Sequence, residues 1–290
     1  MRAFCTDTKV RVILIHDICL KTNVGEHRWE TAQSVTHLVR RMMKNSSHLP
    51  SNLRLLDLCS GTGCIPLLFH HEFRASEVTS SIQLDSLGVD ISSQAVDLAK
   101  RNLEQIQSQS DMSRDTTTFI QADIFSPSFL DDLKASSAPR TALTPAPHVR
   151  EKPRSFDILV SNPPYISPTA FRTTTSFSVR KYEPSLALVP DDRHSVPGVD
   201  RGDTFYPHLL RIADQVGAKI VLFEVADMEE ALRVARMVEE RDWGMVEIWR
   251  DEPAVEGKMD EILDGVRVRG AGKGRSVFAC RAEGRDWVGH

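Results

Sequence analysis

Residues Ser155–Ile166 read Ser-Phe-Asp-Ile-Leu-Val-Ser-Asn-Pro-Pro-Tyr-Ile, an apolar run that stops at the tetrapeptide Asn162–Tyr165. A short aliphatic run bounded by proline is typical of a buried strand. The residue before a proline is driven out of the helical region of backbone space, so the end of the strand stays extended. We therefore expect Asn162 to lie at the carboxyl edge of a β-sheet.

The tetrapeptide has the chemistry to hold a planar amino group. Pro163 and Pro164 have no backbone N–H, so the carbonyl groups around Asn162 and Pro163 lack a local donor and can point outward as acceptors. Two neighbouring acceptors suit the two hydrogens of an NH2 group, and Tyr165 adds an aromatic face. The alternative interpretation is an ordinary turn at a strand end, because Pro and Asn are common in turns.

Three upstream segments repeat the pattern of an apolar strand that ends in a polar residue. These predicted strands and their acids are Leu53–Cys59 with Asp57, Gln83–Val89 with Asp90, and Thr116–Gln121 with Asp123. In an open α/β sheet, ligands bind beyond the carboxyl ends of the strands. We therefore expect the three acids to lie near one another and near Asn162.

Helical patterns alternate with the strands. The predicted helices are Trp29–Met43, a segment from Ile65 with Pro66 in its first turn, Gln94–Ile106 capped by Ser92, Phe205–Val216 and Met228–Arg241, and the remaining strands are Lys219–Val225, Met245–Arg250 and Ser276–Arg281. This alternation predicts an α/β fold whose mostly parallel sheet has helices on both faces. Residues 134–154 contain four prolines and almost no large apolar side chains, which predicts a flexible surface insertion.

The composition limits the class of protein. The 290 residues are 41% hydrophobic and 26% charged, as in a soluble globular chain. A net charge of -4 argues against a dedicated nucleic-acid binder, which normally carries a basic excess. The five cysteines form no Cys-x-x-Cys pair and no metal-ligand spacing, so we expect a reducing compartment and no metal. No apolar run approaches the ~20 residues of a membrane span.

The strand-end residues predict a nucleoside site. Gly61 and Gly63 let the backbone approach a ligand closely, but the turn lacks the Gly-x-Gly-x-x-Gly and Gly-Lys-Ser/Thr patterns that hold pyrophosphates. Asp90 can accept two hydrogen bonds from a ribose, and Asp123 with Ile124 suits an adenine. S-adenosylmethionine, a nucleoside with a cationic and phosphate-free tail, fits this acidic set. Taken singly, each acid could instead cap a turn, neighbour a helix cap or be a solvated strand end.

These motifs together resemble the HemK/PrmC protein-glutamine N5-methyltransferases, which modify the Gly-Gly-Gln glutamine of class 1 peptide-chain release factors. The resemblance covers roughly residues 27–281. The matching segments are Asp57–Ile65 for the cofactor loop, Gly88–Ser92 for the ribose-binding strand end, Asp123–Phe125 for the adenine site, Ser161–Ile166 for the family signature, and His27–Thr31 for the opening of the catalytic domain.

The resemblance implies a Rossmann-like class I S-adenosylmethionine-dependent methyltransferase with a mostly parallel, seven-stranded sheet. It implies a substrate glutamine held by Asn162, Pro163, Pro164 and Tyr165. Asn162, Pro163 and Tyr165 are the expected catalytic residues, with the Asn162 side chain and the Pro163 carbonyl as acceptors. The implied cofactor-binding residues are Asp57, Cys59, Ser60, Gly61, Thr62, Gly63, Asp90, Ile91, Asp123, Ile124 and Asn162.

The tetrapeptide alone does not identify the methylated polymer. Adenine-N6 and cytosine-N4 methyltransferases of nucleic acids carry it too, because their substrates also present a planar NH2 group. Val179–Leu188 resembles the Arg-x-x-Glu-Pro-x-x-Ala-Leu segment of the glutamine enzymes, which favours a release factor as protein substrate. A nucleic-acid amino-methyltransferase is the first alternative, and an inactive binding protein with the methyltransferase fold is the second.

The resemblance also sets expectations for organisation and location. Residues 1–26 form a short N-terminal segment in place of the family's docking domain, and residues 27–290 form the catalytic domain. We expect a monomer that binds neither membranes nor nucleic acids directly. The segments resemble the bacterial and organellar branch, so we expect a mitochondrial location, with the cytoplasm as the alternative. Arg267–Arg275 is predicted to be a glycine-rich turn between the last two strands, or alternatively a loop that contacts nucleic acid.

Overall fold

The computed structural model describes residues 28–108, 114–135, 155–173, 175, 177–182, 184–194, 200–255 and 260–289. The N-terminal segment 1–26 lies outside them, as does nearly all of the predicted insertion at 134–154. Glu183, which belongs to the Glu-Pro segment, also lies outside the described residues.

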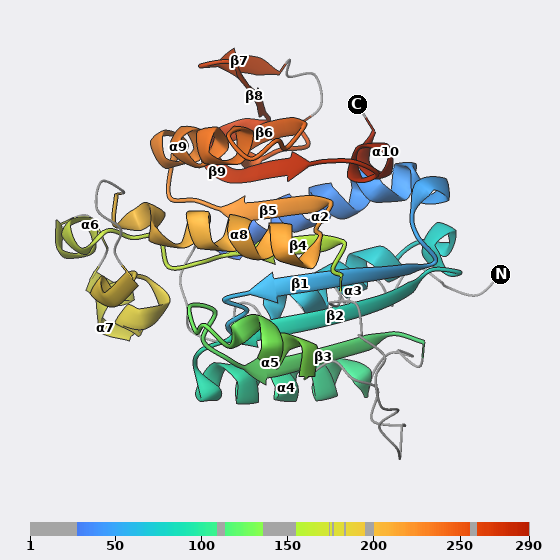
Figure 1. Ribbon diagram of the computed structural model, residues 1–290, viewed down its shortest axis with the longest axis horizontal. Coiled ribbons are helices and arrows are strands. Elements are labelled where there is room, and N and C mark those ends of the chain that lie inside the picture. Colours follow the sequence, from blue (N-terminus) through green and yellow to red (C-terminus); the bar gives the residue numbers. More distant parts are fainter. Residues whose placement is uncertain are drawn as a thin grey trace.

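A nine-stranded sheet, in the order β3-β2-β1-β4-β5-β9-β6-β8-β7, forms the centre of the described chain (Figure 1). Strands β1 to β5 are mutually parallel, whereas β9 runs antiparallel between β5 and β6. The expected α/β, Rossmann-like class is confirmed. The strands are β1 (Asn52–Leu58), β2 (Gln83–Asp90), β3 (Thr116–Gln121), β4 (Ile158–Ser161), β5 (Ile220–Glu224), β6 (Met245–Glu252), β7 (Glu261–Leu263), β8 (Val266–Arg269) and β9 (Ala271–Cys280).

The predicted count of seven strands is wrong, because β7 and β8 extend the sheet beyond β6. In β8, Val266 and Val268 are buried while Arg267 between them is exposed, so the strand has only two buried apolar residues. The predicted glycine-rich turn at Arg267–Arg275 is also wrong. This segment forms the end of β8 and the start of β9, joined at Gly270 in a left-handed conformation (φ 86°).

Helices cover both faces of the sheet, with α8 and α9 in front and α2 and α3 behind in Figure 1. Successive side chains of a strand point to opposite faces. Leu55 of β1 packs with α2 and α3, and Leu56 packs with α8 and α9, which explains why leucines point to both faces of this strand. The helices are α2 (Arg28–Lys44), α3 (Cys64–Arg74), α4 (Ser93–Gln107), α5 (Phe129–Ala135), α6 (Pro168–Thr173), α7 (Phe177–Tyr182), α8 (Tyr206–Val216), α9 (Met228–Glu239) and α10 (Gly284–Val288).

The strand order reverses between β1 and β4. The chain moves from β1 to β2 and β3 on one side, then returns to add β4 and β5 on the other. Leu58 of β1 pairs with Ser161 of β4, so Cys59 and Asn162 leave adjacent strands at the same level. Ligands of open α/β sheets bind at such a reversal point, which places the expected site between these two strand ends.

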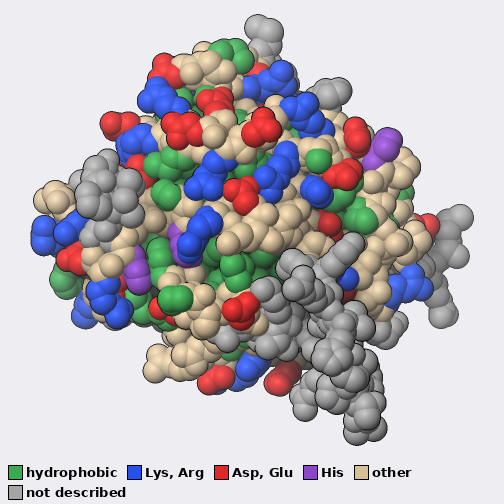
Figure 2. All heavy atoms as spheres, in the orientation of Figure 1, with side chains coloured by type: hydrophobic (Ala, Val, Ile, Leu, Met, Phe, Trp, Pro, Cys, Tyr) green, Lys and Arg blue, Asp and Glu red, His purple; other side chains and the backbone are tan. Residues whose placement is uncertain are grey.

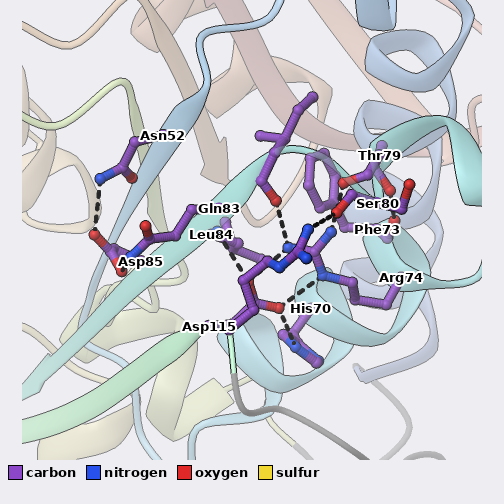
Figure 3. A network of polar contacts seen from close by, with 12 residues as sticks. Asn52, His70, Phe73, Arg74, Thr79, Ser80, Gln83, Leu84, Asp85 and Asp115 are labelled. Atoms are coloured by element: carbon purple, nitrogen blue, oxygen red, sulfur yellow. Dashed lines mark hydrogen bonds and ion pairs between the residues drawn. The ribbon is translucent and has the colours of Figure 1, made fainter.

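A polar network ties α3 to the start of β3, at the edge of the sheet (Figure 3). The carboxylate of Asp115 accepts hydrogen bonds from Nε of Arg74 at 2.7 Å and from the backbone N–H of Leu84 at 3.0 Å. Nε2 of His70 lies 2.8 Å from the same carboxylate. Arg74 also donates to the Thr79 carbonyl at 2.5 Å, so the network fixes the connection between α3 and β2.

Replacing Asp115 with asparagine is expected to destabilise the fold by about 2–3 kcal/mol at neutral pH. Although burial raises the pKa of Asp115, hydrogen bonds from His70, Arg74 and Leu84 lower it well below the ordinary value of 3.8. A carboxyl whose pKa is lowered by folding stabilises the fold above its unfolded pKa, and this contribution is lost as the pH falls. Urea unfolding should therefore show a smaller difference from wild type at about pH 3 than at pH 7. An equal difference at both pH values would contradict this account.

Candidate active site

A cavity of about 400 Å³ opens where the central parallel strands end. Figure 2 shows hydrophobic and histidine side chains gathered on this side of the molecule, at the left of the view. The cavity also receives Thr31 and Ala32 from α2, and Phe205 from the segment before α8. The predicted site residues that line it are Cys59, Ser60, Gly61, Thr62, Asp90, Ile91, Asp123, Ile124, Asn162, Pro163, Pro164 and Tyr165. The structure thus brings most of the predicted cofactor-binding residues and the predicted substrate-binding turn Asn162–Tyr165 into one cavity.

Asp90 organises the glycine turn and retains acceptor capacity. Its Oδ2 accepts the backbone N–H of Gly61 at 2.7 Å, and its Oδ1 accepts the N–H of Ser92 at 2.8 Å. Each carboxylate oxygen can accept two hydrogen bonds, so each retains capacity for one more donor. Gly61 has φ 55°, and a Cβ at this position would meet nothing within 4 Å. The turn therefore presents bare backbone to the cavity.

Gly63 does not line the cavity, and its expected cofactor-binding role stays a prediction. It has φ 79°, and a Cβ there would lie 2.6 Å from the Phe119 ring. Gly88 has a similar constraint, because its Cβ would lie 2.4 Å from Phe119 and 2.5 Å from Oγ of Ser60. The two glycines therefore allow close packing behind the cavity wall.

Asp57 also lies behind the wall instead of lining the cavity. It is fully buried, and neither carboxylate oxygen has a hydrogen-bond partner among the described residues. Burial raises the pKa of Asp57 well above its usual value, and the charge of Asp90 adds to this effect. An unpaired buried carboxylate costs free energy. Burial therefore favours the protonated, neutral form of Asp57.

Cys59, the residue after β1, has a left-handed conformation with φ 61°. Cys59→Gly is expected to change the free energy of unfolding by less than about 1 kcal/mol. Glycine removes the backbone strain at this positive φ, and this gain offsets the larger conformational entropy that glycine loses on folding. Cys59→Val is expected to destabilise by about 2 kcal/mol or more, since a β-branched residue fits this region poorly. Urea unfolding of both variants checks the prediction. It is wrong if the valine variant is as stable as the glycine variant.

An apolar surface adjoins the acids. Ile91 is apolar yet 41% exposed, and it lines the cavity together with buried Ile124. Oδ1 of Asp123 accepts the backbone N–H of Phe125 at 2.9 Å, which fixes the turn after β3. Flat apolar surface beside free acceptor oxygens suits a heterocycle that carries an amino group.

An aromatic cluster around Phe125 was missed by the sequence analysis. The Phe125 ring stacks on His194 with centroids 4.0 Å apart and on His208 with centroids 4.5 Å apart, and it meets the edge of Phe205. Nε2 of His208 lies 2.6 Å from the carbonyl of Ile124. These contacts join segments far apart in the sequence, and no local motif predicts them.

The tetrapeptide is held rigidly at the end of β4. Oγ of Ser161 donates to the Leu58 carbonyl at 2.7 Å, which ties β4 to β1. Pro163 and Pro164 are buried, whereas Asn162 is half-buried and none of the hydrogen bonds among the described residues uses its side chain. Its amide oxygen is therefore available to a ligand in the cavity.

The Tyr165 hydroxyl is turned away from the cavity toward β5. It donates to Oε1 of Glu224 at 3.2 Å, and burial raises the pKa of Tyr165 well above its usual value. Oε2 of Glu224 accepts the hydroxyl of Thr31. Only the ring of Tyr165 can therefore serve as a contact surface for a ligand. Glu224 was not predicted as a site residue, because no sequence motif links it to the tetrapeptide.

The segment that begins at Pro184, directly after Glu183, reaches the same cavity. Pro184, Leu186 and Leu188 line it, and the backbone N–H of Ile166 donates to the Leu188 carbonyl at 2.9 Å. Glu183 and the side chain of Val179 lie outside the described residues, so the expected substrate-recognition role of this segment stays a prediction.

The described residues contain no group of three or more His, Cys, Asp or Glu side chains able to hold a metal ion. In the same residues, no helix combines the length and apolar character needed to cross a membrane.

Comparison with known proteins gave matches to methyltransferases. A family model described as Eco57I restriction-modification methylase matches residues 86–186. The chain is 26% identical to the probable MRF1 mitochondrial N(5)-glutamine methyltransferase mtq1 of Schizosaccharomyces pombe, over 74% of this chain and 61% of that protein. It is 33% identical to the release factor glutamine methyltransferase of Chlorobaculum tepidum, over 56% of this chain and 44% of that protein. The chain thus spans about half the length of these relatives.

Among solved structures, the N-terminal domain of human METTL16 in complex with SAH matches 84% of this chain and 67% of that chain, with a TM-score of 0.42 and 10% sequence identity.

Proposed function

Because this chain is homologous to the release factor glutamine methyltransferases, we propose that it methylates the side-chain nitrogen of a glutamine in a peptide-chain release factor. The methyl donor would be S-adenosylmethionine, and the target the Gly-Gly-Gln glutamine of a class 1 factor. The observation that carries the proposal is one cavity lined both by Asp90 and Asp123 and by the Asn162–Tyr165 turn.

The residues present fit the donor. Asp90 has acceptor capacity left for two ribose hydroxyls, Ile91 and Ile124 offer apolar surface for an adenine, and Asp123 offers an acceptor for its amino group. When bound, S-adenosylmethionine supplies a methyl group on a positively charged sulfur.

The Asn162–Tyr165 turn would orient the glutamine amide. An amide nitrogen is a poor nucleophile because its lone pair is delocalised, so its orientation toward the methyl group decides the rate. Oδ1 of Asn162 and the carbonyl of Pro163 would accept the two amide hydrogens and stabilise the positive charge that grows on nitrogen. The nitrogen gains the methyl group and then loses one proton, so no base is needed before transfer. The Tyr165 ring would pack on the glutamine side chain.

A methyl-transfer assay with tritium-labelled S-adenosylmethionine tests the function. We expect label in a release-factor fragment that carries the Gly-Gly-Gln loop, and none in the matched fragment whose glutamine is replaced by alanine. Mass spectrometry should locate one added methyl group on that glutamine. Equal labelling of both fragments would defeat the proposal, as would transfer to DNA or RNA with none to the release factor.

Location and assembly are further parts of the proposal. The fission yeast relative is described as mitochondrial, which supports a mitochondrial location for this chain. We also propose that residues 27–290 form the catalytic domain and that the chain acts as a monomer. Fractionation of cells that express a C-terminally tagged chain tests the first point, and sedimentation of the purified chain tests the monomer.

A further inference from the structure

Glu224 at the end of β5 joins two parts of the cavity wall that are distant in sequence. The side chain is 3% exposed. One carboxylate oxygen accepts the hydroxyl of Tyr165 at 3.2 Å, and the other accepts the hydroxyl of Thr31. Tyr165 and Thr31 both line the cavity, whereas Glu224 does not. Glu224 therefore supports two wall residues without meeting a ligand itself.

The surroundings keep Glu224 and the Tyr165 backbone in place. The Tyr206 hydroxyl donates to the backbone carbonyl of Glu224 at 2.9 Å, which anchors the strand end to α8. A Cβ at Gly202 would lie 2.7 Å from the carbonyl oxygen of Tyr165, so the chain packs closely against the turn on that side. A loss of the Glu224 contacts would therefore release the Tyr165 ring and the start of α2 more than the rest of the wall.

We propose that Glu224 is a positioning residue for methyl transfer, which holds the Tyr165 ring and Thr31 in fixed relation around the reacting amide. The kinetic test of this inference rests on the proposed function, because it measures methyl transfer to a release-factor fragment. A displacement of about 1 Å in a substrate-positioning group can lower a rate by 10²-fold, so two hydroxyl contacts on one carboxylate can decide the rate.

The arrangement is complete only when Glu224 is ionised. An ionised carboxylate has an acceptor for each hydroxyl, whereas a protonated one turns one oxygen into a donor. Burial raises the pKa of Glu224 to about 7, against the hydrogen bond from Thr31 and the charge of Arg275. The other ionisable groups that face this cluster are Glu30 of α2, Glu230 of α9, and the hydroxyls of Tyr165 and Tyr206. The contacts should therefore form as the pH rises through neutrality.

The test compares wild type and Glu224→Gln in the full chain, with the release-factor fragment as substrate. We expect the wild-type kcat to rise with pH through about 7 and then level off. In Glu224→Gln the kcat should be about tenfold lower at high pH, and this rise should be absent. The affinity for S-adenosylmethionine, measured by calorimetry, should change by less than about threefold, since Glu224 does not line the cavity.

Two further variants separate positioning from general loss of stability. Glu247→Gln changes a glutamate that is also buried and is bonded to Arg41 and Trp249, neither of which lines the cavity. It should lower the melting temperature and leave the pH dependence of kcat unchanged. Tyr165→Phe keeps the ring and removes the hydroxyl contact. Its effect on kcat should not add fully to that of Glu224→Gln, because both variants act on the support of the same ring.

Hydrogen exchange gives a readout that needs no substrate. The backbone amides of Tyr165 and Ile166 should exchange faster in Glu224→Gln than in wild type, because the turn has lost a support. If wild type fails to methylate the fragment while this difference is seen, the proposed function is overturned and the positioning contact is supported. Unchanged exchange, or a wild-type kcat and pH profile in Glu224→Gln, would overturn the inference itself.

Discussion

Replacing Asn162 with alanine is expected to lower the rate of methyl transfer by about 10²-fold or more while S-adenosylmethionine still binds. The change removes the acceptor that would hold one amide hydrogen of the glutamine and stabilise the charge growing on nitrogen. The turn itself should survive, because Ser161 still bonds to the Leu58 carbonyl and the two prolines remain buried.

Single-turnover methyl transfer to the release-factor fragment measures this effect, and calorimetry measures cofactor affinity. Asn162→Asp is the matched variant, since it keeps an acceptor oxygen of the same reach and should retain more activity than alanine. Near-normal turnover in Asn162→Ala would refute the assigned role. A parallel loss of cofactor affinity would show instead that the cavity had collapsed.

Replacing Asp90 with alanine should have the opposite pattern, with weakened cofactor binding. Hydrogen bonds to a charged group contribute about 1.5–3 kcal/mol each, so the dissociation constant should rise roughly 10- to 10²-fold or more. Part of this loss would come from the turn, because Asp90 also holds the backbone N–H groups of Gly61 and Ser92. At saturating cofactor, kcat should fall much less than in Asn162→Ala.

Calorimetry with S-adenosylmethionine is the direct measurement for Asp90→Ala. Asp97→Ala is a suitable control, because Asp97 is an exposed acid on the neighbouring helix α4 and does not line the cavity. It should bind the cofactor as wild type does. An unchanged affinity in Asp90→Ala would rule out the expected ribose contact.

The central fold was predictable from the sequence because its strands are short segments with apolar residues at their buried positions. The prediction for β3 matches the observed Thr116–Gln121, and that for β2 differs only in its last residue, Asp90. Ser92 caps α4 as predicted, by accepting the N–H of Ala95. By contrast, β7 and β8 at the sheet edge carry little apolar signal, and they were missed.

The residues of the cavity wall were predictable only where they belong to a short sequence motif. The strand-end acid Asp90 and the turn that starts at Asn162 line the cavity, as the order of the strands indicates. Asp57 shares the strand-end pattern but is fully buried, because its side chain points behind the wall. The bond from Thr31 to Glu224 joins residues 193 positions apart, a pairing set by helix packing that no local pattern encodes.

The place of β9 in the sheet has a consequence for synthesis on the ribosome. β9 (Ala271–Cys280) separates β5 from β6, so these two strands have no partner on their facing edges until residues near the C-terminus have been made. Unpaired strand edges recruit strands of other chains. A nascent chain that stops before β9 would therefore contain the residues of the cavity wall, but β5 and β6 would each have an unpaired edge that can bind strands of other chains. We expect such truncated products to aggregate even though every cavity-lining residue precedes the missing strand.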